Sequence, residues 1–179
     1  TPTPAGSAPT AAPLPNFDKW GATTREDMTT IRKVTVQSMT RSWTTIPHVT
    51  QNDTADVTEM EKFRKAHGKS VQAAGGKLTA TAILVKILSE ALKHFPQFNA
   101  SIDTSTSQII YKQFYNIGIA VDTEHGLMVP NIKNVNTKSL TAIAVEMSQM
   151  SERARTRKIT LDDLQGTTMT ITNLGGIGG

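Results

Sequence analysis

Residues 116–130 constrain the fold more than any other stretch of this chain; they read Asn-Ile-Gly-Ile-Ala-Val-Asp-Thr-Glu-His-Gly-Leu-Met-Val-Pro. Two apolar, β-rich runs flank a short cluster of turn-forming residues at 124–126. This arrangement is typical of two neighbouring strands joined by a tight turn. We therefore expect strands at residues 115–123 and 127–133, and a fold that contains a sheet.

Length and composition limit the class of protein. The 179 residues, 37% of them hydrophobic, suit one domain with a sizeable core. The sequence has neither eighteen consecutive apolar residues nor the start of a secretory signal, so we expect an intracellular protein, located in the cytoplasm if the source is bacterial and in the mitochondrial matrix if it is eukaryotic. The absence of cysteine excludes disulfides and a thiolate nucleophile, and a net charge of +4 with scattered basic residues does not favour nucleic-acid binding. Any thiol in the chemistry must come from a substrate.

The first 16 residues differ in composition from the rest. They hold five of the eight prolines together with Ala, Thr, Ser and Gly, and the first charged residue is Asp18. Such a segment is a semi-stiff tether that cannot bury apolar area. We expect a linker over residues 1–16, with something attached upstream, and one domain over residues 17–179.

Helical spacing and capping residues predict two helices in the first half of the domain. One runs from Thr24, with Asp27 three residues later as a weak capping signal, to about Pro47. After a predicted strand at residues 48–56, Asp56 and Glu59 predict a capping box for the second helix. Gly-Gly at residues 75–76 ends it.

The second half alternates helices and strands. Residues 78–95 are apolar on nearly every side, which predicts a central helix buried on more than one face. Further strands are expected at residues 108–115 and 167–172, and a long helix around residues 140–150. Because there is no strict βαβ rhythm, G-x-G-x-x-G or P-loop, an α/β two-layer sandwich is favoured over a nucleotide-binding fold.

Three segments carry a family resemblance: Ile-Pro-His-Val-Thr-Gln at 46–51, residues 116–130, and Met-Thr-Ile-Thr-Asn-Leu-Gly-Gly-Ile-Gly-Gly at 169–179. Together they resemble the catalytic core of the dihydrolipoyl acyltransferases of 2-oxoacid dehydrogenase complexes, over about residues 17–179. The resemblance implies a chloramphenicol-acetyltransferase-like fold and trimers that assemble into a 24-mer or 60-mer. It also implies a lipoyl domain outside this chain, and 2-oxoacid decarboxylase and dihydrolipoyl dehydrogenase components as partners.

In that family an acyl group moves between the thiol of coenzyme A and the thiol of a lipoyl group, so both nucleophiles belong to substrates. The protein has to supply a base, a donor for the developing oxyanion and a channel that brings the two substrates together. Residues 46–59 look most like the pyruvate branch, which implies acetyl as the transferred group.

The resemblance also implies roles for three residues. Thr172 matches the family's Ser or Thr that hydrogen-bonds the oxyanion, Arg64 an Arg that contacts coenzyme A phosphate, and Ser101 a position lining the coenzyme A site. A guanidinium suits phosphate because its planar donors bind bidentately. The alternatives are an ordinary strand Thr, a solvated helix Arg and a strand-edge Ser.

None of the four histidines fits the family's general base, which lies in an Asp-His-Arg-x-x-Asp-Gly motif that these 179 residues do not contain. We therefore expect the core to be C-terminally incomplete. We expect His48 to have a structural role at the start of a strand. His67, near a helix end, and His125, in a turn, should be solvated. His94 lies near a helix C-terminus, where the helix dipole favours a positive charge. No H-x-x-x-H or H-E-x-x-H pattern supports a metal site.

Two other functions remain open. A non-catalytic scaffold subunit of the same kind of complex would also lack the Asp-His-Arg-x-x-Asp-Gly motif. An antibiotic acetyltransferase of the same fold is disfavoured by the Pro/Ala linker, because a free trimeric enzyme does not need a tether to a lipoyl domain.

Overall fold

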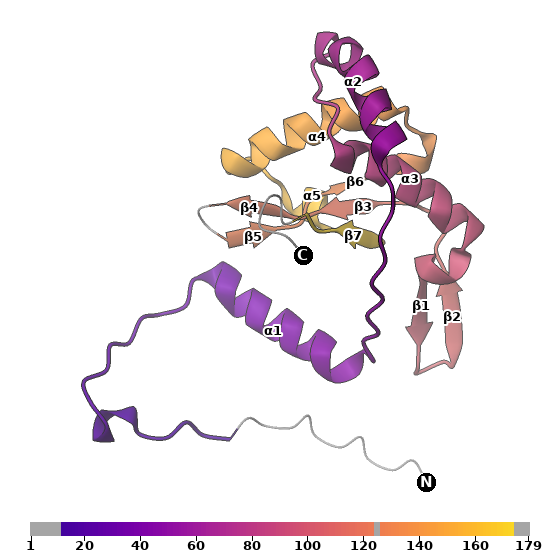
Figure 1. Ribbon diagram of the computed structural model, residues 1–179. Helices are drawn as coiled ribbons and strands as arrows, with labels where there is room; N and C mark the ends of the chain where they lie inside the picture. Colours follow the sequence, from indigo (N-terminus) through magenta and orange to yellow (C-terminus); the bar gives the residue numbers. More distant parts are fainter. Residues whose placement is uncertain (1–11, 124–125, 174–179) are drawn as a thin grey trace. The chain divides into compact units, whose positions relative to one another are not determined.

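The computed structural model describes residues 12–123 and 126–173, and the chain divides into two compact units, Thr1–Pro47 and His48–Gly179 (Figure 1). The first unit contains the 3₁₀ helix η1 (Phe17–Lys19) and the helix α1 (Thr30–Thr45). The predicted helix start at Thr24 is wrong, because residues 24–29 have no regular structure. The hydroxyl of Thr29 caps the helix instead, accepting from the Arg32 N–H at 3.3 Å.

The second unit begins with an irregular segment. Residues 48–57 contain neither helix nor strand, so the strand predicted at 48–56 is wrong. No described strand pairs with this segment, and an isolated strand has no ladder to stabilise it. The predicted capping box is also wrong: Asp56 Oδ1 accepts from the N–H and the hydroxyl of Thr58 at 2.9 and 2.6 Å, and Val57 is the N-cap.

Four α-helices follow among the described residues of the second unit. They are α2 (Thr58–Ala73), α3 (Ala80–His94), α4 (Leu140–Arg155) and the short α5 (Leu161–Leu164). As predicted, α2 ends before the glycine pair, and Gly75 adopts a φ of 86° that suits glycine. Gly76 passes so close to α4 that a Cβ there would lie 2.8 Å from the Val145 backbone nitrogen. Glycine at this position thus permits the close approach of the α2–α3 connection to α4.

Seven short strands form three sheets among the described residues. The strands are β1 (Ala100–Asp103), β2 (Gln108–Tyr111), β3 (Ile117–Ile119), β4 (Val121–Thr123), β5 (Gly126–Met128), β6 (Asn131–Ile132) and β7 (Met169–Ile171). β1 pairs with β2 and β4 with β5, both antiparallel, and the third sheet has the order β6-β3-β7. The two predicted strands around the turn are confirmed: Ile117 pairs with Ile132 and Val121 with Met128. β7 joins β3 in parallel, although 49 residues (120–168) separate them along the chain.

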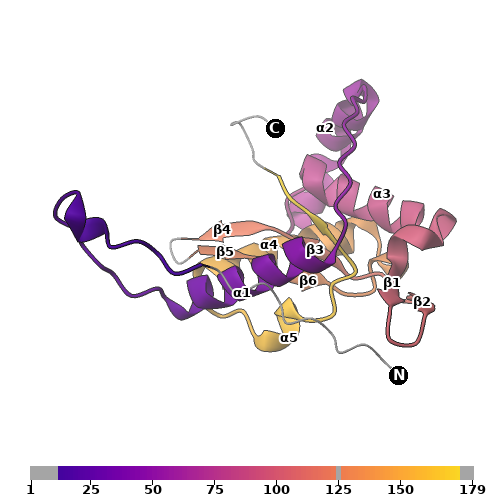
Figure 2. The same cartoon turned by 90° about the horizontal axis from the view of Figure 1, so that it is seen from below.

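Within this unit, α3 and α4 lie on one side of the β6-β3-β7 sheet, which gives two layers (Figures 1 and 2). The 3₁₀ turns η2 (Pro96–Asn99) and η3 (Val135–Thr137) flank these elements. The main core lies between helices and sheet, with buried side chains from α3, β3, β6, η3 and α4: Val85, Leu92, Ile117, Ile132, Val135, Ile143 and Met150. A second cluster joins α2, α3 and α4: Val71, Leu78, Ala82, Ile83 and Ala144. Burial of this apolar surface is what stabilises the unit.

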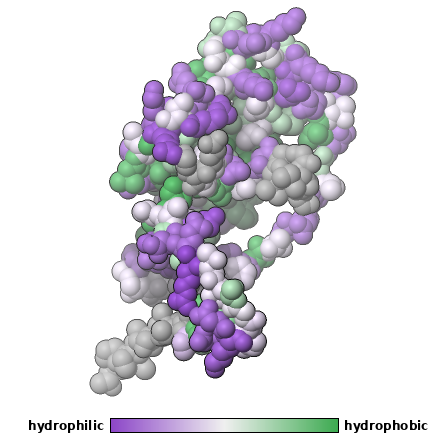
Figure 3. Space-filling model, turned by 90° about the vertical axis from the view of Figure 1, so that its left-hand side faces the viewer, coloured by the Kyte–Doolittle hydropathy of each residue, from purple (hydrophilic) through white to green (hydrophobic). Residues whose placement is uncertain are grey.

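The predicted burial of α3 on several faces is confirmed only in part. Its residues on one broad side are buried, whereas Leu84 and Ile87 are 43% and 53% exposed. The β1–β2 hairpin also exposes apolar side chains, with Ile102 and Ile109 opposite each other in register. On the face in Figure 3, hydrophobic residues show as small patches between hydrophilic ones. Among the described residues, no helix combines the length and apolar character needed to cross a membrane.

Candidate functional site

Thr172 directly follows β7, at the point where the chain leaves the sheet. The strand end is held in place, because the Ala120 N–H donates to the Ile171 carbonyl at 3.1 Å. The Thr172 side chain is exposed and hydrogen-bonds to no other residue in the described part of the chain. Its hydroxyl is thus free to donate to a group that arrives from outside this chain.

The next residue ties this end of the sheet to a helix. The Asn173 side-chain amide donates to the hydroxyl of Thr81 at 3.2 Å, and Thr81 is in the first turn of α3. The two residues are 92 positions apart in the sequence. Neither residue was predicted as a site residue from the sequence, and no local pattern could have paired them.

A glycine lets β7 approach β3 closely. A Cβ on Gly118 would lie 2.8 Å from Thr167 Cγ2 and 3.0 Å from both Thr170 Oγ1 and Val129 Cγ1. Distances this short are not tolerated between carbon and its neighbours without a shift of the strands. The absence of a side chain at Gly118 therefore helps to set the position of β7, and with it that of Thr172.

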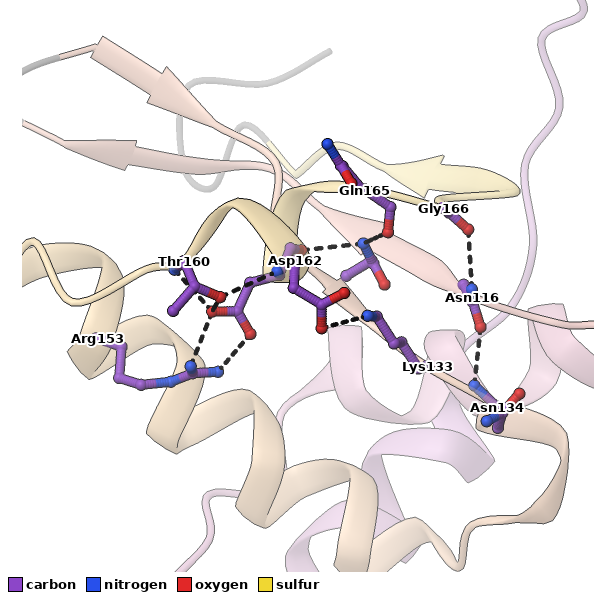
Figure 4. Close-up of polar contacts among 10 residues, drawn as sticks. Asn116, Lys133, Asn134, Arg153, Thr160, Asp162, Gln165 and Gly166 are labelled. Carbon is purple, nitrogen blue, oxygen red and sulfur yellow. Dashed lines mark hydrogen bonds and ion pairs between the residues drawn. The ribbon is translucent and has the colours of Figure 1, made fainter.

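Buried asparagines hold the segment that leads into β7 (Figure 4). The side chain of Asn116, just before β3, donates from Nδ2 to the Gly166 carbonyl at 2.8 Å and accepts from the Asn134 N–H at 2.9 Å. Its own carbonyl accepts from the Thr168 N–H at 2.8 Å. Because Asn116 is only 8% exposed, these bonds are shielded from competing water.

Asn131 on β6 makes a second set of such bonds. Its Nδ2 donates to the carbonyls of Asp163 and Gln165, both at 2.9 Å. The side chain is 3% exposed, and its Oδ1 has no hydrogen-bond partner within the residues described. These two bonds dock the end of α5 against the β6-β3-β7 sheet, so that the chain enters β7 from a fixed position.

The carboxylate of Asp163 is the centre of a charged cluster with Arg153 and Thr160 (Figure 4). Arg153 donates from Nη1 and Nη2 to the two carboxylate oxygens at 2.8 and 3.0 Å, and the Thr160 N–H and hydroxyl each donate at 2.8 Å. Desolvation acts to raise the pKa of Asp163, but the hydrogen bonds from Thr160 and Arg153 outweigh it and hold this pKa below its ordinary value. The spacing of Thr160 and Asp163 is that of a capping box, a local signal that the sequence analysis missed.

Arg64 lies half-buried on α2 and is already paired. Its Nε donates to both carboxylate oxygens of Glu61 at 2.9 and 3.0 Å, and its Nη2 donates to Oε2 at 2.8 Å. These hydrogen bonds lower the pKa of Glu61 and raise that of Arg64, so both groups are ionised at neutral pH. Only Nη1 stays outside the pair, so a phosphate would have to share Arg64 with Glu61 or displace it.

Ser101 lies on β1, is exposed, and faces Ile110 across the hairpin. Figure 1 shows α2, which carries Arg64, beyond the N-terminal end of α3, and β1 beyond its C-terminal end. None of the hydrogen bonds or ion pairs among the described residues joins Thr172, Arg64 and Ser101. The structure therefore places the three residues on separate elements and does not bring them into direct contact.

The histidines supply no catalytic pair within the described residues. His67 lies in the body of α2, where Nδ1 is 3.0 Å from the Phe63 carbonyl and the ring stacks on Phe63, so its predicted place near a helix end is wrong. His94 ends α3, as predicted. His48 is exposed in the irregular segment and not at a strand start, and His125 lies outside the described residues. The described residues also contain no group of three or more His, Asp or Glu that could hold a metal ion.

Comparison with known proteins gives consistent results. Residues 21–179 match the family "2-oxoacid dehydrogenases acyltransferase (catalytic domain)". The dihydrolipoyllysine-residue acetyltransferase component of the pyruvate dehydrogenase complex of Pseudomonas aeruginosa is 42% identical over 169 residues, which are 93% of this chain and 31% of that protein. The chain thus spans about a third of the length of the curated relatives it matches.

Two solved structures have the same fold. One is a dihydrolipoamide acetyltransferase from Azotobacter vinelandii, in which the catalytic roles of a serine, a histidine and an asparagine were investigated. The other is the cubic core of a pyruvate dehydrogenase multienzyme complex. Each matches with a TM-score of 0.88 and 41% identity, over 95% of this chain and 70% of the other. The expected two-layer α/β fold of the chloramphenicol-acetyltransferase type is confirmed, and the chain belongs to the 2-oxoacid dehydrogenase acyltransferase (catalytic domain) family.

Proposed function

We propose that this chain forms the core of an acetyltransferase that moves an acetyl group between the lipoyl group of a pyruvate dehydrogenase complex and coenzyme A. One observation carries the proposal: the Thr172 hydroxyl is exposed at the end of a firmly held strand and has no partner among the described residues. A hydroxyl in this state can donate to an oxyanion without first breaking another bond. The activity named for the Pseudomonas aeruginosa relative supports the choice of acetyl transfer.

The reaction needs no nucleophile from the protein. The thiolate of coenzyme A attacks the carbonyl carbon of the acetyl-lipoyl thioester, and a new carbon–sulfur bond forms. The carbonyl oxygen becomes an oxyanion, to which Thr172 donates a hydrogen bond. Collapse breaks the bond to the lipoyl sulfur, which takes up a proton, and gives acetyl-coenzyme A and dihydrolipoamide. We assign no general base, because none of the described histidines lies beside Thr172 in a hydrogen bond.

The two other candidate residues, Arg64 and Ser101, differ in how readily they could contact coenzyme A. Arg64 offers Nη1 to a phosphate, while Glu61 occupies Nε and Nη2. Ser101 is exposed and can reach a ligand from the hairpin. Because α2 and β1 lie at the two ends of α3, we propose that these residues contact different parts of an extended coenzyme A molecule or of two molecules in an assembly.

The test is substitution of Thr172 in the full-length protein. Thr172→Ala removes the donor, and we expect acetyl transfer to fall by about 10² to 10³. Thr172→Ser keeps a hydroxyl and is the matched control, with a loss of less than about tenfold. A fall of less than about fivefold for Thr172→Ala would show that the oxyanion role is wrong.

A second candidate function is that of a structural core, with or without catalysis. The match to a cubic core supports self-assembly, and the exposed apolar residues Ile102 and Ile109 are suited to a subunit contact. We propose trimers that build a larger core, bound to a lipoyl domain, a 2-oxoacid decarboxylase and a dihydrolipoyl dehydrogenase, in the cytoplasm of a bacterium. The mass of the full-length particle by light scattering distinguishes a trimer from a 24-mer and a 60-mer. An assembled particle, of 24 or 60 subunits, without transferase activity would favour the scaffold over the enzyme.

A further inference from the structure

We infer that Asn173 and Thr81 are positioning residues that orient the hydroxyl of Thr172 during acyl transfer; this inference rests on the proposed function. Thr172 lies between two fixed points. On one side the Ala120 N–H holds the Ile171 carbonyl at 3.1 Å, and on the other the Asn173 amide holds the Thr81 hydroxyl at 3.2 Å. The backbone around Thr172 thus spans from a sheet to a helix over a single residue.

Both points belong to rigid parts of the unit. The sheet point, Ala120, directly follows β3, whose Ile117 is fully buried and whose Gly118 is in close contact with β7. The helix point lies in the first turn of α3, where Thr79 caps the helix by accepting from the Ala82 N–H at 3.1 Å. Ala82 is itself fully buried. A side chain held between two such elements keeps its place during a reaction better than one on a free chain end.

The orientation of the hydroxyl follows from the backbone. Threonine is branched at Cβ, so few χ1 values are allowed, and the direction of Oγ1 depends on the local backbone angles. Without the Asn173–Thr81 bond, the tie from this side of Thr172 to the first turn of α3 would be lost. An oxyanion donor acts only within about 2.7–3.1 Å of the developing charge, so a displacement of about 1 Å costs a large part of the rate.

A positioning role and general stabilisation of the fold predict changes in different kinetic and stability parameters. Neither Asn173 nor Thr81 needs to touch a substrate, so the loss should fall on kcat and leave both KM values unchanged. Neither side chain is ionisable, so the pH dependence of kcat should also stay the same. A residue that only stabilises the fold would lower the melting temperature and the amount of active protein, but would not change kcat per active site.

The experiment compares two substitutions at one position in the full-length protein. Thr81→Val removes the hydroxyl at nearly constant shape, whereas Thr81→Ser keeps it. We expect kcat for acetyl transfer from acetyl-dihydrolipoamide to coenzyme A to fall about three- to tenfold in Thr81→Val and less than about twofold in Thr81→Ser. Asn173→Ala should lower kcat at least as much as Thr81→Val, because it removes the same hydrogen bond. Equal kcat values in the valine and serine variants would overturn the inference.

A double substitution separates this inference from the function on which it rests. In a Thr172→Ala background there is no hydroxyl to orient, so Thr81→Val should change kcat by less than about 1.5-fold. If Thr172→Ala is slow and Thr81→Val slows both backgrounds by the same factor, Thr81 does not act through Thr172 and the inference is wrong. If Thr172→Ala itself is nearly as fast as the unchanged protein, the proposed function fails, whatever the result at Thr81.

Discussion

Replacement of Asp163 by alanine should destabilise the second unit more than any other single change on α5. The carboxylate accepts from Arg153 through two nitrogens and from Thr160 through the backbone N–H and the hydroxyl. Asp163→Ala removes all four bonds at once. The chain then loses the part of the α5 cap that the Asp163 side chain supplies, and the link from α5 to the last turn of α4; the bond from the N–H of residue 163 to the Thr160 hydroxyl remains.

The size of the effect follows from the exposure of the partners. Loss of a helix cap costs about 1 kcal/mol. The ion pair adds about 1 kcal/mol and not the larger value of a buried pair, because the Arg153 side chain is 39% exposed and can turn to water, although Asp163 is only 16% exposed. The free energy of unfolding should therefore fall by about 2 kcal/mol.

Asp162→Ala is the matched control on the same short helix. Asp162 pairs with Lys133 at 2.6 Å, but its side chain is 84% exposed, so its loss should cost less than about 0.5 kcal/mol. Urea unfolding followed by far-UV circular dichroism measures both changes. Equal losses in the two variants would refute the reasoning.

The effect of Asp163 should also depend on pH. Its pKa lies below the ordinary value in the folded protein, so its charged form stabilises the fold at every pH above the ordinary Asp pKa. This contribution is lost as the pH falls through the folded-state pKa. The stability difference between the unchanged protein and Asp163→Ala should hold from neutral pH to about pH 4 and shrink below it. A difference that grows in acid would contradict the assignment.

Two further substitutions test the packing of the α2–α3 connection against α4 and the binding of coenzyme A phosphate by Arg64. Gly76→Ala should cost about 1–3 kcal/mol in unfolding experiments, because its Cβ would meet the Val145 backbone nitrogen at 2.8 Å; Gly68→Ala in α2, where the new methyl group meets nothing within 4 Å, should be neutral or stabilising. Glu61→Ala frees the Arg64 guanidinium, so if Arg64 binds a coenzyme A phosphate, the KM for coenzyme A should fall about two- to fivefold and rise in Arg64→Met. An unchanged KM in both variants would remove Arg64 from the coenzyme A site.

The parts of the fold that the sequence predicts are those set by local apolar spacing. Strands at 115–123 and 127–133 were predictable because two apolar, β-rich runs flank a cluster of turn-forming residues, and Ile117 and Ile132 in these runs are both fully buried. The parallel pairing of β7 with β3 was not predictable in this way, since it joins residues from opposite ends of the unit. Such contacts leave no periodic signal in either segment.

The errors come from patterns that the tertiary structure does not use. Residues 48–56 alternate like a strand, but no described strand pairs with them, and Val49 is 92% exposed. Thr24 and Asp27 have the spacing of a helix start, yet Thr29 is the residue that caps α1. A local pattern of this kind shows what a segment can form, and the rest of the chain decides whether it does.

The candidate site also has a part that local sequence predicts and a part that it does not. The place of Thr172 at the end of a strand was predictable from the short motif around it. Its setting was not, because the bonds from Asn173 to Thr81 and from Asn116 to Gly166 span 92 and 50 residues. A chain with valine at position 81 would keep the whole motif at 169–175. It would still be recognised as a member of the family, but if Thr172 is the oxyanion donor that we propose, it would transfer acyl groups more slowly, because the motif would supply the donor and the fold its direction.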